Sequence, residues 1–150
     1  MLLQTLQPYI IALAIGLLIG IERERSHPPG TQPIGLRTFM LFSLLGAIAT
    51  GVHQPLTAAA ITLFVSAIIV ISYMRCTRGQ FNAASDGLGI TTEVAAVVTY
   101  ALGMMTYLNP LATLIISLIV IIILFAKERL HAFTRERLRK EEMQATLTIL

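Results

Sequence analysis

Charged and hydroxyl side chains gather in two short parts of an otherwise apolar chain, and the first part could handle ions. It comprises residues 16–25 and 35–38, with the polar side chains Glu22, Arg23, Glu24, Arg25, Arg37 and Thr38. The two glutamates fall at the C-terminal end of a predicted helix, where the helix dipole disfavours negative charge, so we expect basic partners nearby. Arg37 could reach Glu22 as a bidentate pair. The cluster is then either a salt-bridge network that sets the topology or a polar gate for ions at the cytoplasmic surface.

The second polar part is residues 85–93, which contain Asp86, Thr91, Thr92 and Glu93. Either threonine is a suitable N-cap for the helix that follows, and Glu93 then lies in its first turn, where negative charge is favoured. Helix capping alone accounts for this pattern. The alternative is metal binding by Glu22, Asp86 and Glu93, because converging carboxylate oxygens suit a hard divalent cation, and Mg²⁺ that retains most of its water fits best. We expect no tightly bound cofactor.

Other chemistry is not supported by the residue pattern. His27 and His131 are predicted on one side of a membrane and His53 on the other, so the three histidines cannot form one metal site. The chain has no nucleophile-elbow spacing and no phosphate-binding Gly-Lys-Ser/Thr loop. Its one cysteine, Cys76, has no partner for a disulfide. We therefore expect a protein that is not an enzyme.

Five apolar stretches must position the polar clusters. They cover residues 2–21, 36–52, 55–73, 93–108 and 110–126, in a chain that is 55% hydrophobic and only 13% charged. A soluble core could not bury so many consecutive apolar segments within 150 residues. We predict an all-α membrane protein, a bundle of five transmembrane helices. The short turns at 53–55 and 109–110 predict two antiparallel hairpins.

The distribution of positive charge predicts the orientation. All eleven Lys and Arg residues fall in the first loop, the third loop and the tail. Because positive charge is retained in the cytoplasm, the N-terminus should lie outside and the C-terminus inside. The expected partner of this charge is the lipid bilayer rather than nucleic acid, since no aromatic residues alternate with the basic ones.

Small residues recur every fourth position in three of the predicted helices. The sets are Ala12, Gly16 and Gly20; Ser43, Ala47 and Gly51; and Ala95, Thr99 and Gly103. Such stripes let helix backbones approach closely, and we add Gly35 to the candidate packing glycines. The stripes pack either within one bundle or across a homo-dimer or other homo-oligomer, and a different membrane protein is a further possible partner.

The domain organisation is expected to be simple. Residues 1–126 should form the five-span membrane domain, and residues 127–150 a charged cytoplasmic helix or linker. The last residues turn apolar again, so this segment is expected to lead to a further C-terminal region.

The sequence resembles the N-terminal membrane domain of the MgtC/SapB family. The resemblance is carried by Gly-Leu-Leu-Ile-Gly-Ile-Glu-Arg-Glu at 16–24 and Ile-Gly-Leu-Arg-Thr at 34–38, and by Gly-Ile-Thr-Thr-Glu-Val-Ala-Ala at 89–96. It implies a multi-pass protein of a bacterial-type inner membrane, associated with survival under magnesium limitation. The functional positions that it implies are Glu22, Arg23, Gly35, Leu36, Arg37 and Thr38, followed by Thr91 and Thr92.

The chain departs from the family pattern at two points. Residues 55–78 contain no glycine, although the third span of the family is typically glycine-rich, and Glu93 stands where members often have alanine. The sequence therefore leaves two functions open. One is magnesium or other divalent-cation homeostasis or transport, and the other is a non-transporting module that regulates or assembles a membrane partner, as some family members do with the F-type ATP synthase.

Overall fold

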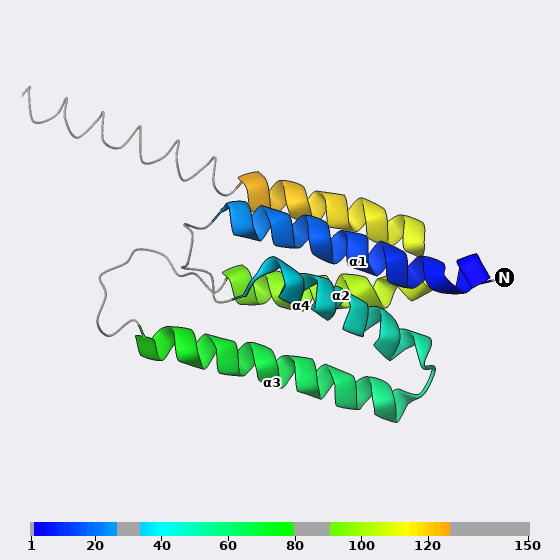
Figure 1. Cartoon of the computed structure of the whole chain (residues 1–150), viewed down its shortest axis with the longest axis horizontal. Coiled ribbons are helices and arrows are strands. Elements are labelled where there is room, and N and C mark those ends of the chain that lie inside the picture. The colour runs from blue at the N-terminus through cyan, green and yellow to red at the C-terminus, as the bar shows by residue number, and fades with distance from the viewer. Residues whose placement is uncertain (1, 27–33, 80–90, 127–150) are drawn as a thin grey trace, which may run out of the picture.

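The computed structural model describes residues 2–26, 34–79 and 91–126, and within these ranges it contains five helices and no strand (Figure 1). The helices are α1 (Leu2–Arg25), α2 (Leu36–Gly51), α3 (Pro55–Gly79) and α4 (Thr91–Leu108), followed by a fifth helix described over Pro110–Ala126. The prediction of an all-α fold is confirmed. Two of the helices, over Leu3–Arg25 and Pro55–Met74, are long and apolar enough to cross a membrane, whereas Leu36–Gly51 and Pro110–Ala126 are apolar but shorter.

Two helices run further than the sequence suggested. α1 continues to Arg25, which places Arg23 and Arg25 in its last turn rather than in a loop. Glu and Arg are good helix formers, and positive charge is favourable at a helix C-terminus, so the polar residues extend the helix instead of ending it. α3 continues to Gly79, so Arg75 and Arg78 also belong to a helix. In α1 and α3 the helix therefore continues beyond the end of the apolar stretch.

Two tight connections reverse the chain between neighbouring helices. His53 follows α2 in the left-handed backbone region, with φ 55°, and its Nδ1 lies 2.6 Å from the carbonyl oxygen of Gly51. Asn109 separates α4 from the fifth helix, and its side-chain oxygen accepts a hydrogen bond of 3.1 Å from the amide of Ala112. This contact satisfies an otherwise unpaired amide in the first turn of the fifth helix. Both predicted hairpins are present.

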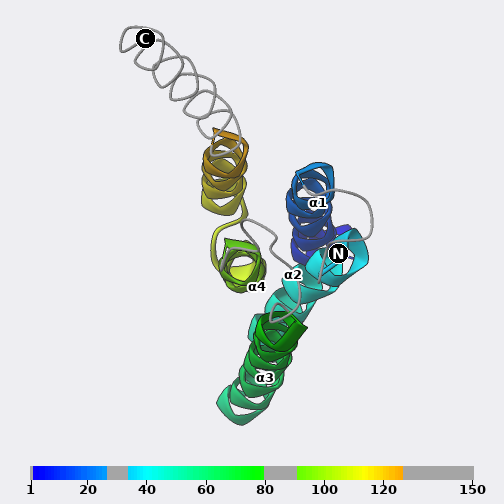
Figure 2. The same ribbon diagram turned by 90° about the vertical axis from the view of Figure 1, so that its left-hand side faces the viewer.

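α1, α2 and α4 form the packed centre of the molecule, while α3 lies at its edge. α2 contacts both α1 and α4, and among the helices α1–α4, α3 contacts α2 and α4 but not α1. In Figure 2, α3 and the fifth helix lie on opposite sides of this centre. The buried side chains of the core include Ile15, Ile19, Phe39, Phe42, Ala96, Tyr100 and Leu102. We call α1, α2 and α4 the central trio.

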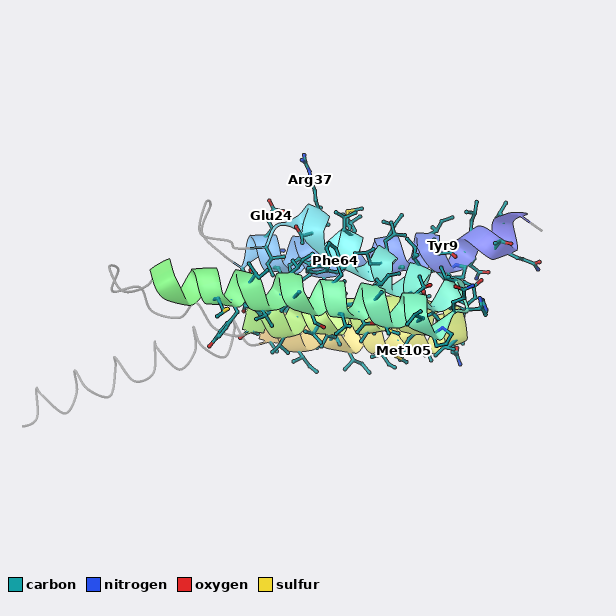
Figure 3. All side chains as sticks on the ribbon, turned by 90° about the horizontal axis from the view of Figure 1, so that it is seen from below. Tyr9, Glu24, Arg37, Phe64 and Met105 are labelled. Carbon is teal, nitrogen blue, oxygen red and sulfur yellow. The ribbon has the colours of Figure 1, made fainter. Side chains whose placement is uncertain are left out.

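The helix directions give the bundle two chemically different ends. The C-terminus of α1 and the N-termini of α2 and α4 lie at one end, which we call the charged end (Figure 1). Glu24 and Arg37 are seen there in Figure 3, far from Tyr9 and Met105. The opposite end holds the N-terminus of α1 and the two tight connections, and we call it the neutral end. No Asp, Glu, Lys or Arg occurs in the parts of the described helices that lie there.

Candidate functional site

Glycines bring the three helices of the central trio into backbone contact. A Cβ atom added to Gly16 would lie 2.6 Å from the Cα of Met40, and one added to Gly20 would lie 3.0 Å from the Cα of Leu36. α1 and α2 therefore touch along the stripe that the sequence indicated. α2 and α4 approach even more closely, because a Cβ on Gly103 would overlap the carbonyl oxygen of Ser43.

Gly46 provides the matching contact on α2, although the sequence stripe did not include it. A Cβ added there would overlap the carbonyl oxygen of Tyr100 and lie 2.8 Å from the backbone nitrogen of Met104. Gly46 on α2 thus faces the backbone of α4, and Gly103 on α4 faces the backbone of α2. Their separation allows Cα–H···O contacts between the two helices. The sequence did carry a signal for Gly46. It lies three residues after Ser43, and residues three or four apart are neighbours on one face of a helix.

This tight packing positions the acidic and basic residues at the end of α1. Glu22 and Arg23 are buried, with exposed fractions of 8% and 4%. Glu22 follows Ile15 and Ile19 at helical spacing on the face that packs into the bundle. Both charged side chains have interaction partners. Burying a charge is unfavourable unless other groups compensate it, so the fold must supply interactions that stabilise these two side chains.

The start of α4 contributes two more buried polar residues at the same end. Thr92 is 4% exposed and Glu93 is 8% exposed. Thr91 begins the helix, so both threonines are helical residues, and Glu93 lies in the first turn as expected. The helix dipole favours a carboxylate there. Since α1 and α4 contact each other, the charged end contains buried carboxylates on two neighbouring helices.

The residues at the start of α2 are more exposed. Arg37 points away from the bundle in Figure 3, and Glu24 is exposed as well. The structure therefore does not show the predicted bidentate pair between Arg37 and Glu22. Gly35 precedes the helix in an extended conformation, and its carbonyl oxygen accepts the amide of Thr38 at 2.9 Å. An added Cβ at Gly35 would meet no atom within 4 Å, so its place is at a helix start and not at a helix contact.

The predicted magnesium ligands are only partly within the described residues. Glu22 and Glu93 are described, whereas Asp86 lies outside the described ranges. The described residues contain no group of three or more His, Cys, Asp or Glu side chains that could hold a metal ion. Convergence of the three carboxylates thus stays a prediction.

A second polar feature lies within the bundle and was not identified from the sequence. The hydroxyl oxygens of Thr62 on α3 and Tyr100 on α4 are 2.8 Å apart. Thr99 and Thr106 are fully buried, and each donates to a carbonyl of its own helix, at 2.7 Å in both cases. These contacts satisfy the hydroxyls inside an apolar bundle. Thr62 and Tyr100 are 38 positions apart in the chain, so no local sequence pattern indicates that their hydroxyls meet.

Apolar helices with ionisable residues buried at one end of the bundle are typical of a helical membrane protein. Comparison with known families makes this assignment specific. Residues 9–133 match the family model described as the MgtC family, so the chain belongs to the MgtC family. The resemblance inferred from residues 16–38 and 89–96 is confirmed, and with it a membrane protein linked to magnesium homeostasis. No curated protein and no solved structure matched the chain.

Proposed function

We propose that this chain is a multi-pass protein of a bacterial-type inner membrane, with five spans, the N-terminus outside and the C-terminus inside. The directions of the helices support this placement, because Arg23, Arg25 and Arg37 all lie at one end of the bundle. That end would face the cytoplasm. α2 has 16 residues and extends about 24 Å, somewhat less than the hydrocarbon thickness of about 30 Å. Local thinning of the bilayer is an inexpensive adjustment to such a difference.

We propose further that the charged end acts in magnesium homeostasis. The observation that supports this role most strongly is the burial of Glu22, Arg23 and Glu93 at the end of an apolar bundle. Ionisable groups in membrane segments are energetically expensive and tend to be retained for function. Carboxylates held on two contacting helices offer oxygen atoms to a hydrated Mg²⁺, directly or through its water. An ion that reaches this end from the cytoplasm would alter the charge balance between α1 and α4.

A direct test compares the cytoplasmic magnesium content of cells that depend on this protein. Cells with the wild-type chain should hold their magnesium content when external magnesium is lowered, and Glu93→Gln should lose most of this protection because the carboxylate charge is gone. Glu24→Gln is the matched control, since Glu24 is exposed at the same end. Equal protection by Glu93→Gln and wild type, with equal protein in the membrane, would contradict the proposed site.

The alternative function, a module that regulates or assembles a membrane partner, is favoured by the position of α3. This helix carries exposed apolar side chains along most of its length, among them Leu63 and Phe64. The small-residue stripes, in contrast, are engaged within the central trio. A partner would therefore bind the outer face of α3 rather than the glycines.

Magnesium flux into proteoliposomes separates the two functions. A transporter should move Mg²⁺ through the purified wild-type chain and lose the flux in Glu93→Gln. A regulatory module should show no flux and should still restore magnesium homeostasis in cells.

A further inference from the structure

The neutral end contains a pocket that the proposed magnesium function does not use. It has a volume of about 420 Å³ and lies between the first turns of α1 and the junction of α4 with the fifth helix. Its lining consists of Gln4, Thr5, Gln7, Pro8, Thr106, Tyr107 and Pro110. The volume falls within the range of small-molecule pockets, about 300–1,000 Å³. Most of these side chains offer neutral donors and acceptors, and none of them is charged.

An apolar groove adjoins this pocket along α1. It has a volume of about 200 Å³ and is lined by Leu3, Ile10 and Ile11 together with Gln4 and Gln7. The two glutamines thus belong to both hollows and mark the boundary between them. A polar pocket that continues into an apolar groove matches a molecule with a polar head and a hydrocarbon chain.

We propose that the two hollows together bind one phospholipid, with its headgroup in the pocket and an acyl chain in the groove. Membrane proteins recognise anionic headgroups through clusters of Lys and Arg, and this pocket has none in its lining. A zwitterionic headgroup is the better match, because its own charges balance. The proposal rests on the membrane placement given above, but it is independent of any role in magnesium handling.

The donors and acceptors favour an ethanolamine headgroup over a choline headgroup. A primary ammonium carries three N–H donors, and the amide oxygens of Gln4 and Gln7 and the hydroxyl of Tyr107 are acceptors for them. A quaternary ammonium has no N–H donor and can only rest against the Tyr107 ring. The amide nitrogens of the same glutamines can donate to the phosphate. Each hydrogen bond that choline cannot form should weaken binding by about fivefold.

Native mass spectrometry of the full chain released from nanodiscs tests this inference. The nanodiscs would hold equal amounts of phosphatidylethanolamine, phosphatidylcholine and phosphatidylglycerol with identical acyl chains. We expect one retained lipid per chain, with phosphatidylethanolamine favoured about fivefold or more over the other two. Equal retention of the three lipids would overturn the proposal. A chain that does not enter nanodiscs at all would instead contradict the membrane placement.

Two glutamine variants test the location of the site. Gln7→Leu should lower the preference for phosphatidylethanolamine by about fivefold, the contribution of one hydrogen bond, while Gln54→Leu should keep it. Gln54 lies at the same end and is exposed, but it lines neither hollow, and it accepts instead from Thr57 at 3.4 Å. Gln7 is exposed too, so its replacement should leave the fold intact. An identical preference in both variants would contradict the location.

A soluble competitor distinguishes a lipid from a free headgroup. Phosphoethanolamine lacks acyl chains and cannot fill the groove, so we expect it not to displace the bound lipid at equal concentration. Displacement at equal concentration would show that the pocket binds the free headgroup, and the lipid assignment would then be wrong.

Discussion

α2 and α3 belong to the same hairpin and are both apolar, but they are held in the bundle in different ways. α2 touches α1 and α4 backbone to backbone, at Gly16, Gly20, Gly46 and Gly103. α3 packs through side chains, chiefly Val65 and Ile69. Lipid tails are as apolar as leucine, so hydrophobicity does not tell a helix where to pack inside a membrane. α3 also contains small residues, among them the alanines at 58–60 and Ala67, but it has no glycine before Gly79. The comparison therefore indicates that glycine contacts, and not apolar content, distinguish a central helix from a peripheral one.

The close packing of α2 also explains where charge can be buried. The glycine contacts of the central trio fix α1 and α4 relative to each other through α2. Glu22 and Glu93, at the ends of these two helices, are therefore held in defined positions. Residues 55–74 of α3 contain no Asp, Glu, Lys or Arg. We expect the central trio to carry the function and α3 to face lipid or a partner.

The largest effect should come from the closest backbone contact. Gly103→Ala places a methyl group against the carbonyl oxygen of Ser43, and neither backbone can move without separating α2 from α4. We expect a loss of about 3 kcal/mol in the free energy of unfolding, the upper range for overpacking. Unfolding of the purified chain in detergent measures it, with Gly35→Ala as the control because that position is open. Equal stability of the two variants would contradict the claim that glycine contacts hold α2 in the bundle more firmly than side-chain packing holds α3.

A smaller effect should follow at Gly20, where the contact is less severe. An added Cβ would meet the Cα, the carbonyl oxygen and the Cγ of Leu36 at 3.0, 3.1 and 3.3 Å. A shift of a few tenths of an ångström relieves these contacts, so Gly20→Ala should destabilise by about 1 kcal/mol. The same unfolding measurement should rank the variants in the order Gly103, Gly20, Gly35. A larger loss at Gly20 than at Gly103 would mean that the α1–α2 contact, not the α2–α4 contact, limits stability.

The smallest effect should be found where α3 meets α4. The hydroxyls of Thr62 and Tyr100 are 2.8 Å apart and join the two helices. Hydrogen bonds between membrane helices contribute about 0.6 kcal/mol on average. A double-mutant cycle with Thr62→Val and Tyr100→Phe should give a coupling energy of this size. A coupling above about 2 kcal/mol would be larger than such bonds usually supply, and α3 would then be as firmly held as α2.

Much of the fold could be predicted from the sequence, because it depends on local patterns. Apolar stretches and short turns indicated the helices and both hairpins, and the small-residue stripes marked the contact faces of the central trio. The sequence placed Glu22 and Glu24 at the end of the first helix, but it assigned Arg23, Arg25, Arg75 and Arg78 to loops, because hydropathy records where a chain is apolar and not where its helices end. The glutamates and arginines at 22–25 continue α1 by their own helix propensity.

The candidate site could be predicted only in outline. The sequence identified Glu22, Arg23 and Glu93 as candidate site residues. It gave Glu24 and Arg37 the same status, although both are exposed in the structure. The phase of α1 separates the two glutamates, because Glu22 shares the face of Ile15 and Ile19 and is buried, whereas Glu24 is exposed. Contacts across distant segments, such as Thr62 with Tyr100, depend on how helices assemble and have no local signal.

The two glutamates at the end of α1 allow the most direct test of the account. Glu22→Gln and Glu24→Gln make the same chemical change two residues apart, at a buried and at an exposed position. The measurement is the cytoplasmic magnesium content of cells that depend on the protein, after transfer to low external magnesium. We predict that Glu22→Gln loses most of the protection and that Glu24→Gln retains it. Equal magnesium content with both variants, at equal protein level, would contradict a role for the buried charge in magnesium homeostasis.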